Sequence, residues 1–330
     1  MSSKMVIIGP SKVGKTALVA SLKQSADIVG LEFIEQGLDV DVLAKNEAAR
    51  DLFNKVFNLV VDGVLPFAGS GDIIDYEIAL KATNNQLGLW EQFLNAIGQG
   101  DPEEATIFFP DAPGGALFQG DAQDDDEIDD VVMLEFRQKL IEHLRDADGL
   151  IICLDSSALR RKNTDDETIK KRRQVAIEFS RWIPDVFSEV LETTSETKLG
   201  LKRVCFVMTK ADLWATQDGV IENAEAAVKN RNAYNHAKAI LGPAFFNSLR
   251  HRFAPHTEIA FCMSSVFGFL DGQPNPHFFT ERDRRDRNRD PKIELDQWCP
   301  YNVVEPFVFL LNGHNIDGRL KVLSPPELGR

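Results

Sequence analysis

The chain has 330 residues, 43% of them hydrophobic, which suffices for one large domain or two small ones. Its 51 acidic and 37 basic side chains give a net charge of −14, which disfavours nucleic acid and anionic lipid surfaces as partners. No stretch approaches the ~20 apolar residues of a membrane span, and the N-terminus leads directly into a strand without a signal peptide, so we expect a cytoplasmic protein.

Strand-like and helix-like segments alternate along the chain, which predicts an α/β fold with a mostly parallel sheet. Six strands are expected, over residues 4–9, 73–82, 104–110, 149–155, 202–208 and 257–264. The strands 149–155 and 202–208 are continuously apolar, as in strands buried on both faces. Helices are expected over 43–62, 131–147, 165–194, 219–252 (as two or three short helices) and 301–312.

Two smaller features bear on this pattern. Pro184 is expected to break or kink the helix 165–194. Three of the four cysteines, Cys153, Cys205 and Cys262, lie in apolar strands, whereas Cys299 stands apart. With no CxxC spacing and scattered histidines, we expect reduced core thiols and no structural zinc.

A glycine-rich turn follows the first strand. Residues 9–16 read GPSKVGKT and match the pattern G-x-x-x-x-G-K-[ST], in which backbone N–H groups surround nucleotide phosphates. Lys15 would place a charge on the β- and γ-phosphates, and the Thr16 hydroxyl would ligate Mg²⁺. The alternative is a strand–helix turn without a ligand. The expected phosphate site consists of Gly9, Ser11, Lys12, Val13, Gly14, Lys15, Thr16 and Ala17.

A second candidate segment ends the strand 104–110, where the sequence continues as Asp111-Ala112-Pro113-Gly114. An aspartate at this position can hold Mg²⁺, usually through water. The N–H of Gly114 can reach the γ-phosphate.

A third segment, Thr209-Lys210-Ala211-Asp212, ends the strand 202–208. The Asp212 carboxylate can accept hydrogen bonds from the N1–H and exocyclic amine of guanine, a donor pair that adenine lacks, while the Lys210 stem lies against the purine. The alternative is a helix N-terminus capped by Thr209 or Asp212. After the strand 257–263, a turn at Ser264 and Ser265 (sequence SSVFG) can direct a backbone N–H at guanine O6.

In this order, GPSKVGKT, DAPG, TKAD and SSVFG resemble the G1, G3, G4 and G5 motifs of Ras-like, TRAFAC-class GTPases, over residues 4 to about 268. Thr209 stands where that class more often has asparagine. The resemblance implies a three-layer P-loop NTPase fold whose six-stranded, mostly parallel sheet has one antiparallel strand, 73–82. It also implies GTP or GDP with Mg²⁺ as ligands and a protein effector or activator as partner.

The chain departs from the small members of that class in spacing. About 55 residues precede the strand 73–82 and about 22 follow it, so a single domain over 1–330 is expected to carry helical insertions at about 26–70 and 84–103. The nearest equivalent of the switch I threonine, which binds Mg²⁺ and the γ-phosphate, is Ser70.

A further departure concerns hydrolysis. The residue after the DAPG glycine, often a glutamine or histidine that orients the attacking water, is Gly115. Gln119 could take this role only if its loop folds back, and we expect Arg160 and Arg161 to lie in solvent. Residues 115–130 would form switch II.

The C-terminal sequence PYNVVEPF, at 300–307, together with the long insertion before the strand 73–82 and the TKAD motif, is similar to the bacterial double-GTPase (DO-GTPase) families, which are associated with conflict and defence systems. The expected function is therefore a GTP-hydrolysing switch. Two alternatives stay open: a GTP-binding interaction module that hydrolyses slowly or not at all, and an ATP-dependent phosphotransferase.

Overall fold

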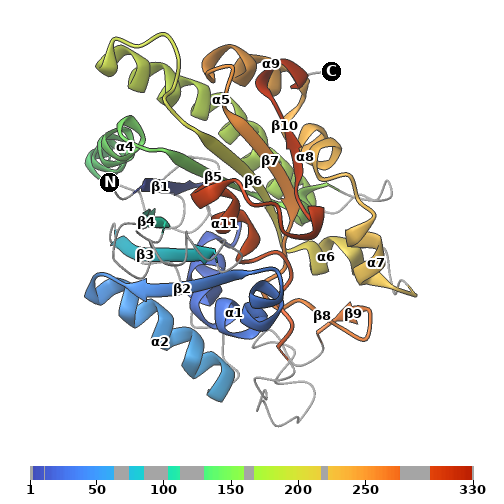
Figure 1. The fold of residues 1–330 in the computed structure, drawn as a ribbon. Coiled ribbons are helices and arrows are strands. Elements are labelled where there is room, and N and C mark those ends of the chain that lie inside the picture. The colour runs from blue at the N-terminus through green and yellow to red at the C-terminus, as the bar shows by residue number, and fades with distance from the viewer. Residues whose placement is uncertain are drawn as a thin grey trace.

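The computed structural model describes residues 3–10, 12–62, 74–84, 103–111, 130–159, 167–216, 222–275 and 298–328. Within these residues, eight strands form one sheet in the order β10-β7-β6-β5-β1-β4-β3-β2 (Figure 1). The strands are β1 (Ser3–Ile8), β2 (Leu38–Ala44), β3 (Ile74–Asn84), β4 (Glu103–Asp111), β5 (Gly149–Asp155), β6 (Arg203–Thr209), β7 (Glu258–Met263) and β10 (Lys321–Leu323).

The helices that surround the sheet are α1 (Lys15–Glu35), α2 (Glu47–Asp62), α4 (Asp130–Arg145), α5 (Glu167–Thr194), α6 (Ala211–Thr216), α7 (Ala224–Lys229), α8 (Ala233–Leu241), α9 (Pro243–Arg252) and α11 (Glu305–Asn312). Short 3-10 turns follow β5, α11 and β10: η2 (Ser156–Ala158), η4 (Ile316–Gly318) and η5 (Pro325–Glu327), respectively. A small hairpin joins β8 (Phe269–Leu270) to β9 (Gln273–Pro274).

The sheet is mostly parallel, which confirms the predicted α/β class. The strands β4, β1, β5, β6 and β7 pair in parallel, and β3 runs antiparallel to both of its neighbours, as expected for residues 73–82. The predicted count of six strands is wrong, because β2 and β10 extend the two edges, and β10 is a second antiparallel strand. Neither edge strand was expected: β2 carries exposed aspartates, and β10 has three residues.

Alternating side chains of the central strands fill two cores. On β6, Val204 and Phe206 belong to the core that includes α4, α5, α8 and α9, whereas Cys205 and Val207 belong to the core that includes α1, α2 and α11. Figure 1 shows α11 in front of β5 and β6, which it contacts. This three-layer arrangement explains why the central strands read as continuous apolar runs. Cys153, Cys205 and Cys262 are buried free thiols, as predicted, and Cys299 is exposed.

The helix boundaries differ from prediction at three points. The expected break at Pro184 is wrong, since α5 continues through it, and the fully buried Phe179, Ile183 and Phe187 hold this helix to the core. The helix expected from residue 43 begins at Glu47, because β2 precedes it. The terminal helix begins at Glu305 rather than at residue 301, and Asn302 has the left-handed φ of 49° that separates it from the preceding turn.

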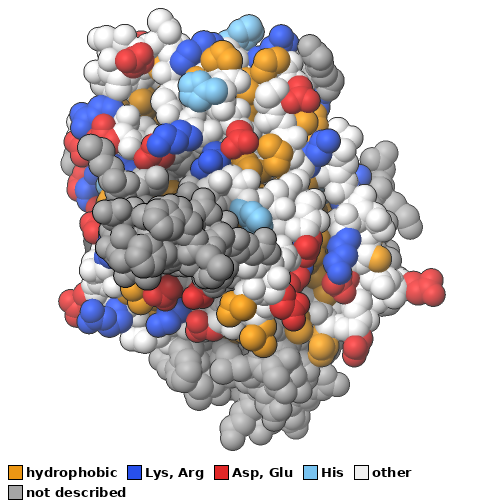
Figure 2. Space-filling model, viewed as in Figure 1, with side chains coloured by type: hydrophobic (Ala, Val, Ile, Leu, Met, Phe, Trp, Pro, Cys, Tyr) orange, Lys and Arg blue, Asp and Glu red, His pale blue; other side chains and the backbone are white. Residues whose placement is uncertain are grey.

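Other features of the outline agree with prediction or lie outside the described residues. Residues 219–252 contain three short helices, α7 to α9. The insertion expected at 84–103 lies almost entirely among residues that the structure does not describe. Among the described helices, none is long and apolar enough to cross a membrane. On the face seen in Figure 2, basic and acidic side chains are interspersed.

Candidate functional site

The predicted motifs meet at one edge of the sheet. Because β1, β4, β5, β6 and β7 are parallel, their C-terminal ends lie together, and each motif follows one of these ends. Val6 on β1 is paired with Phe108 on β4, so the same register places the backbone of Asp111 level with Gly9. The structure therefore brings the loop 9–16, the segment 209–212 and the loop 264–268 to one site, with the end of β4 beside them.

The loop after β1 packs directly against β5. A Cβ added to Gly9 would lie 2.5 Å from the carbonyl oxygen of Cys153, so only glycine fits this close approach. Lys12 and Gly14 have positive φ angles of 59° and 95°, which turn the chain back before α1 begins at Lys15. The sequence motif is thus folded as a compact turn between a strand and a helix.

The end of this loop is arranged for an anion. Lys15 is 8% exposed, and its ammonium group donates to the Pro10 carbonyl at 2.7 Å, inside the loop. The 21-residue helix α1 starts after Gly14 with no side-chain cap and with no acidic residue in its first turn. A helix N-terminus concentrates N–H donors and a partial positive charge, which phosphate groups satisfy.

Thr209 and Lys210 join the loop to the neighbouring strands. The Thr209 hydroxyl donates to the Val13 carbonyl and, at 3.0 Å, to the Leu154 carbonyl, so its one proton is shared between them. Lys210 has a φ of 56°, and its ammonium group donates to the Lys12 carbonyl at 2.5 Å. Segments almost 200 residues apart in the chain are thereby hydrogen-bonded into one site.

Asp155, at the end of β5, is a site residue that the sequence analysis missed. It is 6% exposed, and its carboxylate accepts from the Lys210 ammonium at 2.7 Å and from the Ser157 N–H at 2.9 Å. The Arg172 guanidinium lies 3.8 Å from Oδ2 of Asp155, the oxygen that accepts from Lys210. The available signal was an acidic residue ending a continuously apolar strand, beside the strand that carries TKAD.

Asp212 lies in the first turn of α6 and is 7% exposed. Burial raises the pKa of its carboxyl, and a hydrogen bond from the Ser265 hydroxyl at 2.7 Å partly opposes that shift. Ser265 in turn accepts from the Gly268 N–H at 2.9 Å. Helix capping does not account for Thr209, because its hydroxyl is bound to the Val13 and Leu154 carbonyls.

The loop 264–268 has one N–H of particular interest. The N–H of Ser264 donates to the Met208 carbonyl at 2.7 Å, and that of Ser265 donates to the Tyr301 carbonyl at 2.9 Å. The Val266 N–H donates to no described residue. The N–H groups of the two serines are therefore already used within the protein, whereas that of Val266 is not used by any described residue.

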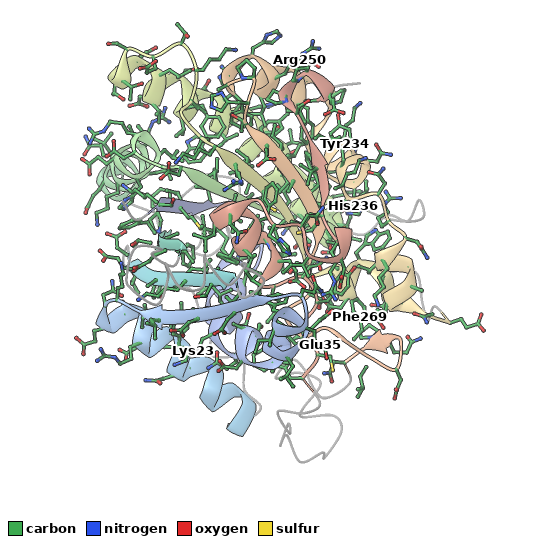
Figure 3. All side chains as sticks on the ribbon, in the orientation of Figure 1. Lys23, Glu35, Tyr234, His236, Arg250 and Phe269 are labelled. Carbon is green, nitrogen blue, oxygen red and sulfur yellow. The ribbon has the colours of Figure 1, made fainter. Side chains whose placement is uncertain are left out.

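A buried imidazole supports the turn after Asp155. His236 on α8, labelled in Figure 3, lies 3.0 Å through Nε2 from the Ser156 carbonyl, while its Nδ1 accepts from the Arg231 guanidinium at 3.1 Å. Nε2 therefore carries the proton. Burial lowers the pKa of His236 to about 4, so the ring is neutral at pH 7.

Several predicted site residues lie outside the description. The side chain of Asp111 is not described, although its backbone ends β4, and Thr16 lies in the first turn of α1. Among the described residues, no group of three or more His, Cys, Asp or Glu side chains is arranged to hold a metal ion. The predictions that fall wholly outside the described residues concern Ser11, Ser70, Gly114, Gly115, Gln119, Arg160 and Arg161.

No protein-family model and no curated protein matches the chain. It is similar in fold to the signal recognition particle receptor SRb-GTP/SRX complex from Chaetomium thermophilum, at 16% identity and a TM-score of 0.36, over 82% of this chain and 94% of that one. It is also similar to the GTP-bound Ski7 GTPase-like domain of S. cerevisiae, at 12% identity and a TM-score of 0.28, over 80% of this chain and 43% of that one. Functional conclusions therefore depend on the residues of the site itself.

Proposed function

We propose that this chain is a single-domain guanine-nucleotide-binding protein that hydrolyses GTP to GDP and phosphate as a nucleotide-dependent switch. The observation that carries the proposal is the pair of contacts from Thr209 and Lys210 to the Val13 and Lys12 carbonyls. They fix the segment that would read the base against the loop that would hold the phosphates. These contacts support one shared ligand site rather than two separate turns.

The choice of base depends on Asp212. Guanine offers N1–H and an exocyclic amine to a carboxylate, whereas adenine presents an acceptor at N1. Because Asp212 is buried, adenine would set its N1 acceptor against the carboxylate with no donor between them, which costs more than the loss of one exposed hydrogen bond. The Ser265 hydroxyl orients this carboxylate, and the Val266 N–H is the donor available for guanine O6. These features favour GTP over the ATP of a phosphotransferase.

The phosphates would lie on the backbone of residues 9–16, on the N-terminus of α1 and on the Lys15 ammonium group. Thr16 and, through water, Asp111 would hold Mg²⁺, and Ser70 would be the third protein ligand. Hydroxyl and carboxylate oxygens suit this hard cation, and the end of β4 lies level with the loop, so the donor set fits. When bound, Mg²⁺ would neutralise charge on the β- and γ-phosphates.

The proposed hydrolysis assigns roles to residues 114–119. The Gly114 N–H would contact the γ-phosphate, and Gln119 is the side chain we assign to orienting water, because Gly115 has none. The proposal therefore expects slow intrinsic hydrolysis that a protein activator increases. The resemblance of residues 300–307, the long segment before residue 73 and the TKAD motif to the DO-GTPase families supports a place in a bacterial conflict or defence system.

Calorimetry with GDP, GTP and ADP, with and without Mg²⁺, tests the binding proposal. We expect GDP and GTP to bind and ADP to bind far more weakly. We also expect Mg²⁺ to increase the affinity for GTP. Equal affinity for ADP and GDP would overturn the choice of guanine. Single-turnover hydrolysis of GTP then separates an enzyme from an interaction module, since a rate equal to that of buffer, alone and with candidate partners, would leave only the module.

A further inference from the structure

A buried histidine lies behind the carboxylate that anchors Lys210. His236 on α8, labelled in Figure 3, is fully buried, and its Nε2–H donates to the Ser156 carbonyl at 3.0 Å. Its ring also packs edge-on against Trp214 on α6, with the ring centroids 5.2 Å apart. The same helix carries Asp212 in its first turn. His236 therefore contacts both the turn after β5 and the helix after β6.

The contact with Ser156 reaches Asp155 through one peptide group. The carbonyl of Ser156 and the N–H of Ser157 belong to the same planar unit, so a bond that holds this carbonyl also sets the direction of this N–H. The Ser157 N–H donates to Oδ1 of Asp155 at 2.9 Å, and the Ser157 hydroxyl donates to the same oxygen. The other carboxylate oxygen, Oδ2, accepts from the Lys210 ammonium group at 2.7 Å. Hydrogen bonds and one rigid peptide group thus join His236 to Lys210.

A further contact holds each end of this chain of groups. Arg231 donates through Nε to Nδ1 of His236 at 3.1 Å, which leaves Nε2 as the nitrogen that carries the proton. At the other end, Lys210 donates to the Lys12 carbonyl at 2.5 Å, within the loop 9–16. The chain of groups therefore runs without a gap from α8 to the loop that would hold the phosphates.

We propose that His236 is a positioning residue for nucleotide binding, which acts through the peptide group between Ser156 and Ser157 to hold Asp155 against Lys210. The proposal rests on the proposed function, because it presumes that the Lys210 stem packs on a bound guanine. Without the Nε2–H donor, the peptide group is freer to rotate and its N–H holds the carboxylate less firmly. The proposal gives this buried histidine a part in ligand affinity as well as in stability.

The test compares the GDP affinities of folded variants by calorimetric titration. His236→Phe keeps a ring against Trp214 and removes the donor to the Ser156 carbonyl, whereas His236→Gln supplies an amide that can still donate. The matched control is Thr257→Val, which removes another buried side-chain donor to a backbone carbonyl, that of Leu201 at 2.8 Å. Thr257 directly precedes β7, at the opposite end of the sheet from the site.

Two further variants keep the test decisive. If His236→Phe does not fold, His236→Asn takes its place, because its amide keeps an acceptor for Arg231 and is too short to reach the Ser156 carbonyl. Urea unfolding shows that each variant is folded before it is titrated. The double variant of His236→Phe with Asp155→Asn tests the route through the carboxylate.

We expect His236→Phe to bind GDP about three- to fivefold more weakly than the wild type does, and His236→Gln to bind within about twofold of it. Thr257→Val should be less stable but should bind GDP as the wild type does. In the Asp155→Asn background, His236→Phe should cause little further loss, because the carboxylate that His236 positions is already replaced.

Wild-type affinity in folded His236→Phe would overturn the positioning role. A loss that adds in full to that of Asp155→Asn would overturn the route through Asp155. A wild type that binds no GDP would instead overturn the proposed function and this inference with it.

Discussion

The ammonium group of Lys210 lies 2.7 Å from the carboxylate of Asp155, which is 6% exposed and ends β5. Lys210 also donates to the Lys12 carbonyl, so one ammonium group joins three parts of the chain: the end of β5, the loop after β1 and the segment after β6. A lysine whose stem is to pack on a purine needs its head group held elsewhere. Asp155 supplies that anchor, with a charge-assisted hydrogen bond.

The first prediction concerns this anchor. Asp155→Asn keeps an acceptor for the Ser157 N–H but removes the charge that holds Lys210. Hydrogen bonds to charged groups are worth more than neutral ones, so we expect GDP to bind about tenfold more weakly to this variant. Calorimetric titration with GDP measures the effect.

Asp146→Asn is the matched control for that experiment. Asp146 makes its ion pair with Arg145 at the surface, where such pairs contribute little. GDP affinity should therefore be unchanged in Asp146→Asn. If Asp155→Asn also retained wild-type affinity, the anchoring role of Asp155 would be wrong.

The second prediction concerns base specificity. In Asp212→Asn an amide replaces the carboxylate that faces the base, and the Ser265 hydroxyl remains beside it. Guanine then loses one of its two acceptor oxygens and faces an NH2 donor with its own amine, whereas xanthine presents a carbonyl to that donor in place of the amine. We expect the variant to bind GDP at least about 100-fold more weakly than the wild type does, and to bind xanthosine diphosphate more tightly than the wild type does.

Competition between the two diphosphates for the variant measures this exchange directly. Binding of inorganic pyrophosphate serves as the control, because it involves the loop 9–16 and not the base. A variant that bound GDP as the wild type does would contradict the assignment of Asp212 to guanine and would favour the ATP-dependent alternative.

The sequence predicted the central part of this architecture well, and the reasons are local. The GPSKVGKT turn and the TKAD segment can be identified from sequence because glycine, lysine and aspartate stand at fixed spacing after apolar strands. Asp155 belongs to no such pattern, because its role arises from contact with Lys210, which comes 55 residues later. The strand β2 was missed because exposed Asp39 and Asp41 make it resemble a loop.

The segment 298–302 was likewise not predictable from local sequence. Nothing in the local sequence of 298–302 indicates that Tyr301 pairs with Ser265, since the pairing depends on how the chain returns along the end of β7. Backbone hydrogen bonds between distant segments carry no side-chain pattern. The motifs therefore predict candidate site side chains but not the segment that supports one of the loops.

The third prediction is a pH dependence of stability. Burial lowers the pKa of His236 to about 4, while an unfolded histidine has a pKa of 6.5. The unfolded chain therefore takes up a proton before the folded one does, so this contribution to stability is complete above pH 6.5 and is lost as the pH falls toward 4. Between pH 7.5 and 5 we expect a loss of about 2 kcal/mol from this group.

Urea unfolding at the two pH values measures that loss in the wild type and in His236→Gln, whose side-chain amide can still donate toward the Ser156 carbonyl. The variant should show the smaller pH dependence. His256→Gln is the control, because His256 is exposed, and it should keep the slope of the wild type. Equal slopes in all three proteins would contradict a neutral, buried His236.

The last prediction separates backbone strain from close contact in the loop 264–268. A Cβ at Gly268 would lie 1.4 Å from the Cys299 carbonyl oxygen, whereas a Cβ at Gly318 would meet nothing within 4 Å. The two glycines have similar φ angles of 71° and 66°. In both alanine variants the left-handed backbone conformation costs about 1 kcal/mol. Only in Gly268→Ala must the segment 298–302 also move away from the loop.

That displacement breaks the hydrogen bonds from Phe269 to Cys299 and between Ser265 and Tyr301. At about 1 kcal/mol for each of these three bonds, Gly268→Ala should lose about 3 kcal/mol beyond the loss in Gly318→Ala, as measured by urea unfolding. Its folded fraction should also bind GDP more weakly, because the Val266 N–H is no longer held. Equal losses of unfolding free energy in the two variants would mean that contact between the loop 264–268 and the segment 298–302 contributes little to stability.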